Sequence, residues 1–168
     1  MQVLNSDIPP GTSFYDLTMK QNDGKVFSFQ SLKNKKVLLV NTASDCGYTP
    51  QYDGLQQLYE KNKKNLVIIG FPANDFGEQE KGDNHKIEEF CKINFGVTFP
   101  LMSKSTVVKE DQQNEVFKWL THKDQNGWND KAPSWNFCKY LVDEAGSLTH
   151  VFEAAIEPAD EKIINAIK

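Results

Sequence analysis

The amino-acid sequence predicts an α/β domain in which helices flank a central mixed sheet. Two short runs, Val37 to Val40 and Leu66 to Phe71, are apolar at successive positions and rich in β-branched residues, which is typical of strands buried on both faces. The segment between them has apolar residues at three- and four-residue spacing, as on the inner face of a helix, namely Tyr52, Leu55, Leu58 and Tyr59. Because parallel strands need such a crossover, these segments predict a βαβ unit.

The segment before this unit predicts a small antiparallel hairpin. Residues Ser13 to Met19 and Lys25 to Phe29 flank the dipeptide Asp23-Gly24, which is a strong signal for a tight hairpin turn.

The segment after the second apolar run predicts a helical insertion. One helical face carries Ile87, Phe90, Cys91 and Asn94, and Asp83 or Asn84 is available as its amino-terminal cap. A second helix is predicted from Gln113, Val116, Phe117 and Leu120.

The carboxyl-terminal part predicts two strands and a last helix. Residues Tyr140 to Val142 and Leu148 to Phe152 flank a turn at Gly146, and Pro158 is predicted to open a helix with Ile163, Ile164 and Ile167 on its inner face. A parallel βαβ unit followed by an antiparallel ββα unit is the layout of the thioredoxin-like fold. No repeat or shift in composition divides the chain, so residues 1–168 are expected to form a single domain.

Composition excludes several classes of partner. The net charge is −4 and lysines are spread along the chain, which disfavours nucleic acid and anionic membranes as partners. No stretch approaches the roughly 20 apolar residues that span a bilayer. The three histidines, His85, His122 and His150, have no ligand-like spacing, so no metal or cofactor is implied.

Three cysteines, Cys46, Cys91 and Cys138, are too few for a disulfide framework, and the odd count leaves at least one thiol free. A reducing, cytoplasmic location is therefore expected, although a trimmed signal peptide would leave no trace. Cys138 is interpreted as a buried bystander.

Cys46 is the candidate nucleophile. It lies between the end of a predicted central strand and the start of the crossover helix, where backbone N–H groups at a helix amino end favour the reactive thiolate over the thiol. A dithiol exchanger needs a second cysteine three residues further on, and Thr49 stands there. Typical peroxiredoxins carry Thr three residues before the nucleophile, where this chain has Ala43.

Four separate motifs then resemble the glutathione peroxidase family. In chain order they are VNTASDCGYTPQYDGLQQLYE, GFPANDFGEQE, FCKINFGVTFPL, and WNF followed by KYLVD. The resemblance implies that Cys46 attacks the peroxide and that Gln79, Trp135 and Asn136 supply neutral N–H donors to the thiolate and the developing alkoxide. Taken singly, Gln79 fits a solvated loop amide and Trp135 a core aromatic residue.

The resemblance also implies a resolving cysteine. Ala73 replaces a cysteine found in many non-animal relatives, which leaves Cys91 at the position of the resolving cysteine in thioredoxin-dependent members. If Cys91 packs on a helix facing the core, residues Asp83 to Asn94 must unwind locally on oxidation, because a disulfide requires close Cα atoms. A structural, buried thiol is the alternative interpretation of Cys91.

The expected reaction is reduction of hydrogen peroxide and organic or lipid hydroperoxides, with thioredoxin as the reductant. The chain has no arginine, which disfavours glutathione, although glutathione dependence and a peroxide sensor that relays oxidation to a partner protein remain alternatives. The short connection from Leu120 to Trp135 predicts a monomer or weak dimer.

Overall fold

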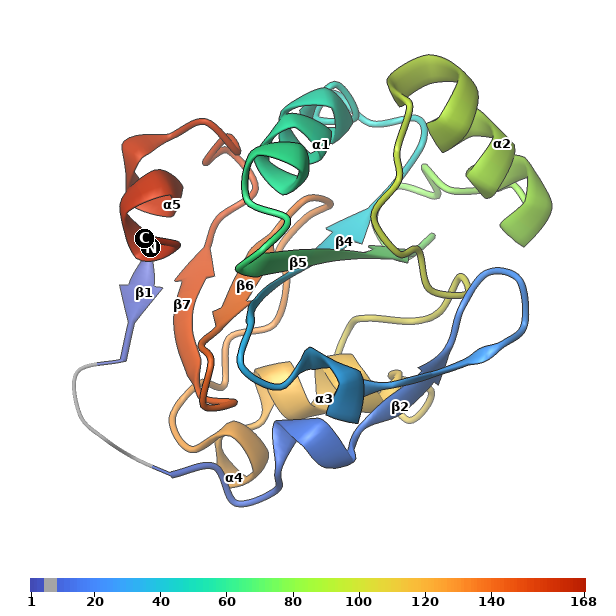
Figure 1. The fold of residues 1–168 in the computed structure, drawn as a ribbon. Coiled ribbons are helices and arrows are strands. Elements are labelled where there is room, and N and C mark those ends of the chain that lie inside the picture. Colours follow the sequence, from blue (N-terminus) through green and yellow to red (C-terminus); the bar gives the residue numbers. More distant parts are fainter. Residues whose placement is uncertain (5–8) are drawn as a thin grey trace.

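The computed structural model describes residues 1–4 and 9–168 and is built around a five-stranded mixed sheet (Figure 1). The order of the strands is β1-β7-β6-β4-β5. Their bounds are β1 Gln2–Val3, β4 Lys36–Thr42, β5 Leu66–Pro72, β6 Lys139–Val142 and β7 Leu148–Phe152. The thioredoxin-like arrangement expected from the sequence is confirmed.

The central strands run in the directions that the sequence predicts. Strands β4 and β5 are parallel, with Thr42 opposite Pro72, while β6 is antiparallel to β4, with Lys139 opposite Val40. As a result, the carboxyl ends of β4 and β5 and the amino end of β6 meet at one edge of the sheet. This edge is where the chain places its candidate chemistry.

Helices cover both faces of the sheet because successive apolar side chains of its strands point to opposite faces. On one face lie α1 (Gln51–Lys61), α2 (Asn84–Phe95) and α5 (Glu161–Ala166), and on the other lie α3 (Glu115–Thr121) and α4 (Lys123–Asn126) (Figure 1). Within β4, Leu38 and Val40 pack toward α1 and α2, whereas Val37 and Leu39 pack toward α3. One sheet therefore serves two hydrophobic cores.

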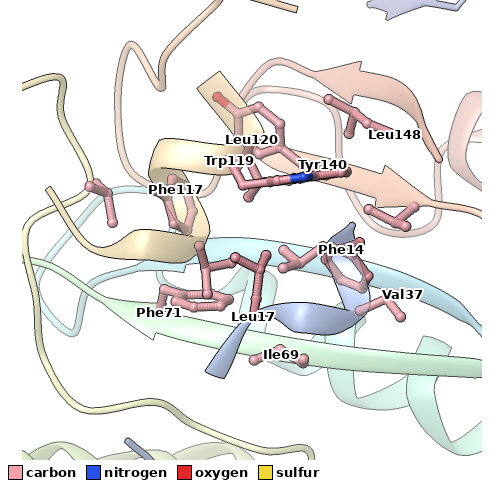
Figure 2. Packing of buried hydrophobic residues seen from close by; sticks show 14 of the residues in the cluster. Phe14, Leu17, Val37, Ile69, Phe71, Phe117, Trp119, Leu120, Tyr140 and Leu148 are labelled. Carbon is pink, nitrogen blue, oxygen red and sulfur yellow. The ribbon is translucent and has the colours of Figure 1, made fainter. Parts of the chain in front are cut away.

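The core below α3 is rich in aromatic side chains. Figure 2 shows Phe117, Trp119 and Leu120 of α3 gathered over the sheet residues Phe71 and Ile69. Phe117 meets Phe71 edge to face, with ring centroids 5.1 Å apart. Such a contact adds about 1 kcal/mol to the burial of the rings.

The amino-terminal hairpin is confirmed as a separate two-stranded sheet. Strands β2 (Thr18–Lys20) and β3 (Val26–Ser28) pair antiparallel, and Gly24 in the turn has φ +87°. They are shorter than predicted because Phe14–Asp16 and Phe29–Leu32 form 3-10 turns whose aromatic residues turn into the core.

One local prediction is wrong, and two further details are not predicted. The last helix begins at Glu161, capped by the Asp160 carboxylate, rather than at Pro158, because that side chain satisfies the N–H of Lys162. Strand β1 is not predicted at all, since two exposed residues carry no periodic pattern. Asn94 has the angular position of the buried face of α2 but is exposed, because it lies in the last turn of that helix.

Within the part of the chain that the structure describes, no helix is long and apolar enough to cross a membrane.

Candidate active site

Thr49, which stands where a dithiol motif would have its second cysteine, fixes the conformation of the Cys46 loop. The backbone N–H of Cys46 donates to Oγ1 of Thr49 at 2.9 Å, and this hydroxyl donates to the carbonyl of Ala43 at 2.9 Å. The backbone N–H of Tyr48 donates to Sγ of Cys46 at 3.4 Å. Helix α1 starts at Gln51, so a turn, rather than the first turn of the helix, surrounds the sulfur.

Gln79 links the Cys46 loop to the segment before β6. Its backbone carbonyl accepts the N–H of Asp45, the neighbour of Cys46, at 3.0 Å. Its side-chain Oε1 accepts Nδ2 of Asn136 at 3.0 Å. Since Oε1 is engaged by Asn136, the amide nitrogen is the end of the Gln79 side chain that remains to donate.

Asn136 is fully buried, whereas Trp135 is 37% exposed. The Trp135 ring packs against Phe76, with centroids 5.8 Å apart, and its carbonyl accepts Nδ2 of the buried Asn41 at 2.9 Å. Within the described residues, Oδ1 of Asn136 has no hydrogen-bond partner. The structure thus gathers the loops of Cys46, Gln79, Trp135 and Asn136 at one sheet edge.

Backbone strain lies beside these residues. Glu78 and Phe137 have φ of 53° and 69°, and they are two of the three non-glycine residues with positive φ in the described ranges. Glu78 precedes Gln79, and Phe137 follows Asn136. Side chains strongly resist this conformation, so the surrounding contacts must enforce it. At Phe137, the N–H donates to the Asn41 carbonyl at 2.6 Å and the ring packs edge to face on Tyr52.

Gly77 shows why this loop needs a glycine. Its φ is +65°, and a Cβ atom there would lie 3.3 Å from Cη2 of Trp135. A larger residue would be strained and would also push the Trp135 ring outward.

Cys91 lies apart from this cluster, on the inner face of α2. It is 1% exposed and packs in the hydrophobic core between α2 and the sheet, and all three cysteines are free thiols. Burial raises the pKa of Cys91 to about 11, the Tyr52 hydroxyl beside it opposes the shift, and Glu80 adds to it. A thiol in this state is unreactive until it is exposed. Cys138 is also buried, and its thiol donates to the Trp135 carbonyl at 3.3 Å.

Sequence reasoning missed two buried charged residues next to the site. Glu80 is 1% exposed, and Lys139 is fully buried. The Lys139 ammonium donates to Oε1 of Gln51 at 2.6 Å and to the carbonyls of Ala154 at 3.2 Å and Ile156 at 2.6 Å. It thereby fixes the first turn of α1 to the chain after β7. The apolar neighbours of Lys139 in its strand were the one available signal, whereas nothing in the sequence distinguishes Glu80 from a solvated loop residue.

Comparison with known proteins agrees with the fold. Residues 14–121 match the glutathione peroxidase family. The chain is 46% identical over 159 residues to a glutathione peroxidase-like peroxiredoxin of Chlamydomonas reinhardtii, covering 91% of this chain and 97% of the relative. It is 45% identical over 149 residues to glutathione peroxidase-like peroxiredoxin 2 of Saccharomyces cerevisiae, covering 88% and 91%.

Among solved structures, Trgpx in its apo form superposes with a TM-score of 0.70 at 35% identity, covering 93% of this chain and 95% of the other. A thiol:disulfide interchange protein of Chlorobium tepidum superposes with a TM-score of 0.69 at 18% identity, covering 98% and 99%, which shows the shared fold alone. The fold and these matches together show that the chain belongs to the glutathione peroxidase family of peroxidases.

Proposed function

We propose that this protein reduces hydrogen peroxide and organic or lipid hydroperoxides with Cys46 as the attacking residue. One observation carries the proposal. Gln79 is hydrogen-bonded both to the Cys46 loop, through Asp45, and to Asn136, so loops distant in sequence supply a nucleophile and neutral donors at one sheet edge. Cys46 is partly exposed, as the approach of a substrate to this residue requires.

In the first step the Cys46 thiolate attacks one peroxide oxygen. A sulfur–oxygen bond forms as the oxygen–oxygen bond breaks, so that Cys46 becomes a sulfenic acid. The leaving alkoxide or hydroxide takes a proton and departs as alcohol or water. Gln79, Trp135 and Asn136 act as donors to the developing negative charge, which neutral N–H groups do without competing for the proton.

Cys91 resolves the sulfenic acid in the second step. The sulfur of Cys91 attacks the sulfur of Cys46, a disulfide forms, and the sulfenic oxygen leaves as water with the Cys91 proton. Because Cys91 lies buried on the inner face of α2, we propose that residues 83–94 unwind from the core before this attack.

An external dithiol protein, thioredoxin, is the proposed reductant of the Cys46–Cys91 disulfide. The absence of arginine from the chain supports this choice over glutathione, since the guanidinium fork is the usual partner of a small carboxylate ligand. Both relatives described above are named glutathione peroxidase-like peroxiredoxins, which agrees with this choice. Three free thiols fit a reducing compartment such as the cytoplasm.

We further propose that residues 1–168 act as one domain and as a monomer or weak dimer. Size-exclusion chromatography with light scattering measures the oligomeric state.

Steady-state peroxide consumption with purified reductants tests the proposal. We expect turnover with micromolar thioredoxin and thioredoxin reductase, and little with millimolar glutathione. Cys46→Ser should abolish turnover. Unchanged turnover in this variant would rule out Cys46 as the attacking residue, and no turnover in the wild-type protein would leave a binding module as the surviving interpretation. Faster turnover with glutathione than with thioredoxin would make glutathione the reductant. Oxidation passed to a partner protein without sustained peroxide consumption would favour a sensor.

A further inference from the structure

The Glu80 carboxyl group occupies an unusual place in the loop that joins the site to α2. It follows Gln79 and lies three residues before Asp83, the amino-terminal cap of α2. The side chain is 1% exposed, and its Oε2 has no hydrogen-bond partner within the described residues. Its backbone is fixed, since its N–H donates to Oδ1 of Asn74 at 3.0 Å. A carboxylate buried in this way is costly, because it loses hydration and one of its oxygens gains no hydrogen bond.

Three elements surround this carboxyl group. The charge of Glu80 contributes to the raised pKa values of Tyr52 in α1 and Cys91 in α2, and Ser44 of the Cys46 loop lies beside the carboxyl group. Lys104 supplies the nearby positive charge, and its ammonium donates to the carbonyl of Glu80 at 3.4 Å and to that of Gly82 at 2.7 Å. Burial raises the pKa of Glu80 to about 6, against the opposing effects of Ser44 and Lys104.

A cavity of about 260 Å³ separates the loop from α2. Residues of the site loops line one side and residues of α2 line the other; they include Asp45, Gln79, Glu80, Lys86, Ile87 and Phe90. Glu80 lines this cavity, so movement of α2 away from the loop would expose its carboxylate to water. Glu80 therefore gains hydration in the same movement that frees Cys91.

We propose that Glu80 is a positioning residue for the resolving step, whose buried carboxylate weakens the docking of α2 and so releases Cys91 toward Cys46. While α2 is docked, burial keeps Cys91 protonated and inert, and the charge of Glu80 adds to this effect. The inference rests on the proposed function, because it concerns the movement that brings Cys91 to a sulfenic acid at Cys46.

The pH dependence follows from the sign of the shift at Glu80. A carboxyl group whose pKa is higher in the docked state than in the open state favours docking at low pH, and this preference is lost as pH rises through about 6. Tyr52 and Cys91 have pKa values raised by burial and stay neutral in this range. Opening of α2 should thus increase by up to about tenfold between about pH 5 and pH 7.5.

The variant Glu80→Gln tests the proposal, with Glu78→Gln, an exposed site in the same loop, as the matched control. After a single pulse of peroxide, formation of the Cys46–Cys91 disulfide is followed by rapid quenching and mass spectrometry. We expect Glu80→Gln to resolve about tenfold more slowly than wild type near pH 7.5 and at a similar rate near pH 5. Taking the ratio of the two rates cancels the titration of the attacking thiol, which both proteins share.

Hydrogen exchange of the reduced wild-type protein gives a second test that needs no variant. Protection factors of α2 amides should fall several-fold between the two pH values, while those of α5 stay constant. A rate ratio or α2 protection that does not change with pH overturns this proposal alone. A wild-type protein that forms no Cys46–Cys91 disulfide overturns the proposed function and this proposal with it.

Discussion

Loosening α2 should accelerate the resolving step. Ile87 lies on the inner face of α2, is 1% exposed, and lines the cavity beside Glu80. The variant Ile87→Val removes one buried methyl group and should weaken the packing of α2 by about 1 kcal/mol. If α2 must leave the core before Cys91 reacts, the open population rises about fivefold, since RT is about 0.59 kcal/mol at room temperature. Disulfide formation after a peroxide pulse should rise by the same factor.

The control for this prediction is Ile163→Val. Ile163 is fully buried in the same hydrophobic core but belongs to α5. Both variants should lower the free energy of unfolding in urea by about 1 kcal/mol, but Ile163→Val should leave the rate of disulfide formation unchanged. Equal rates in the two variants, or slower resolution in Ile87→Val, would refute local unwinding of α2.

Three further predictions concern other residues at or next to the site. Gln79→Ala should slow the first oxidation of the protein by about 10²–10³-fold in stopped-flow fluorescence, because it removes a donor to the developing charge; an effect below tenfold would contradict that role. Cys91→Ser should accumulate the Cys46 sulfenic acid, trapped with dimedone, and lose thioredoxin-supported turnover, whereas Cys138→Ala should retain it. Burial lowers the pKa of Lys139 from 10.5 to about 8, so the folded state binds fewer protons than the unfolded state between these values. Its stability should rise relative to Lys139→Met by about 2 kcal/mol from about pH 7.5 to pH 10 in urea titrations, and parallel stability curves would contradict this.

The periodic elements could be predicted because each depends on neighbours in sequence. Strands β4 and β5 were recognised from their successive apolar residues, and α1 and α2 from three- and four-residue spacing. The cap of α2 at Asp83 is likewise a local hydrogen bond, to the N–H of Lys86. The start of α5 predicted at Pro158 is wrong, because Asp160 caps the helix and a helix that began earlier would lose this cap.

The candidate site could be predicted in part. The resemblance to the glutathione peroxidase family predicts the site residues Cys46, Gln79, Trp135, Asn136 and Cys91, and their roles stay proposals. The bond from Asn136 to Gln79 spans 57 positions, and no local pattern specifies a contact at that separation. Thr49 was recognised as the residue that excludes a dithiol motif, but its hydrogen bonds to the Cys46 loop emerged from the turn geometry.

The sequence by itself determined the chemical groups, the order of the strands and helices, and the presence of a nucleophile without a nearby second thiol at Cys46. Tertiary structure decided which charged side chains lose water. Nothing in the sequence distinguishes Glu80 from a surface residue, and only its apolar neighbours in the strand distinguish Lys139, yet packing buries both. The physical reason is that burial and electrostatic environment are set by elements far apart along the chain, whereas helical and strand periodicity is set within a few residues.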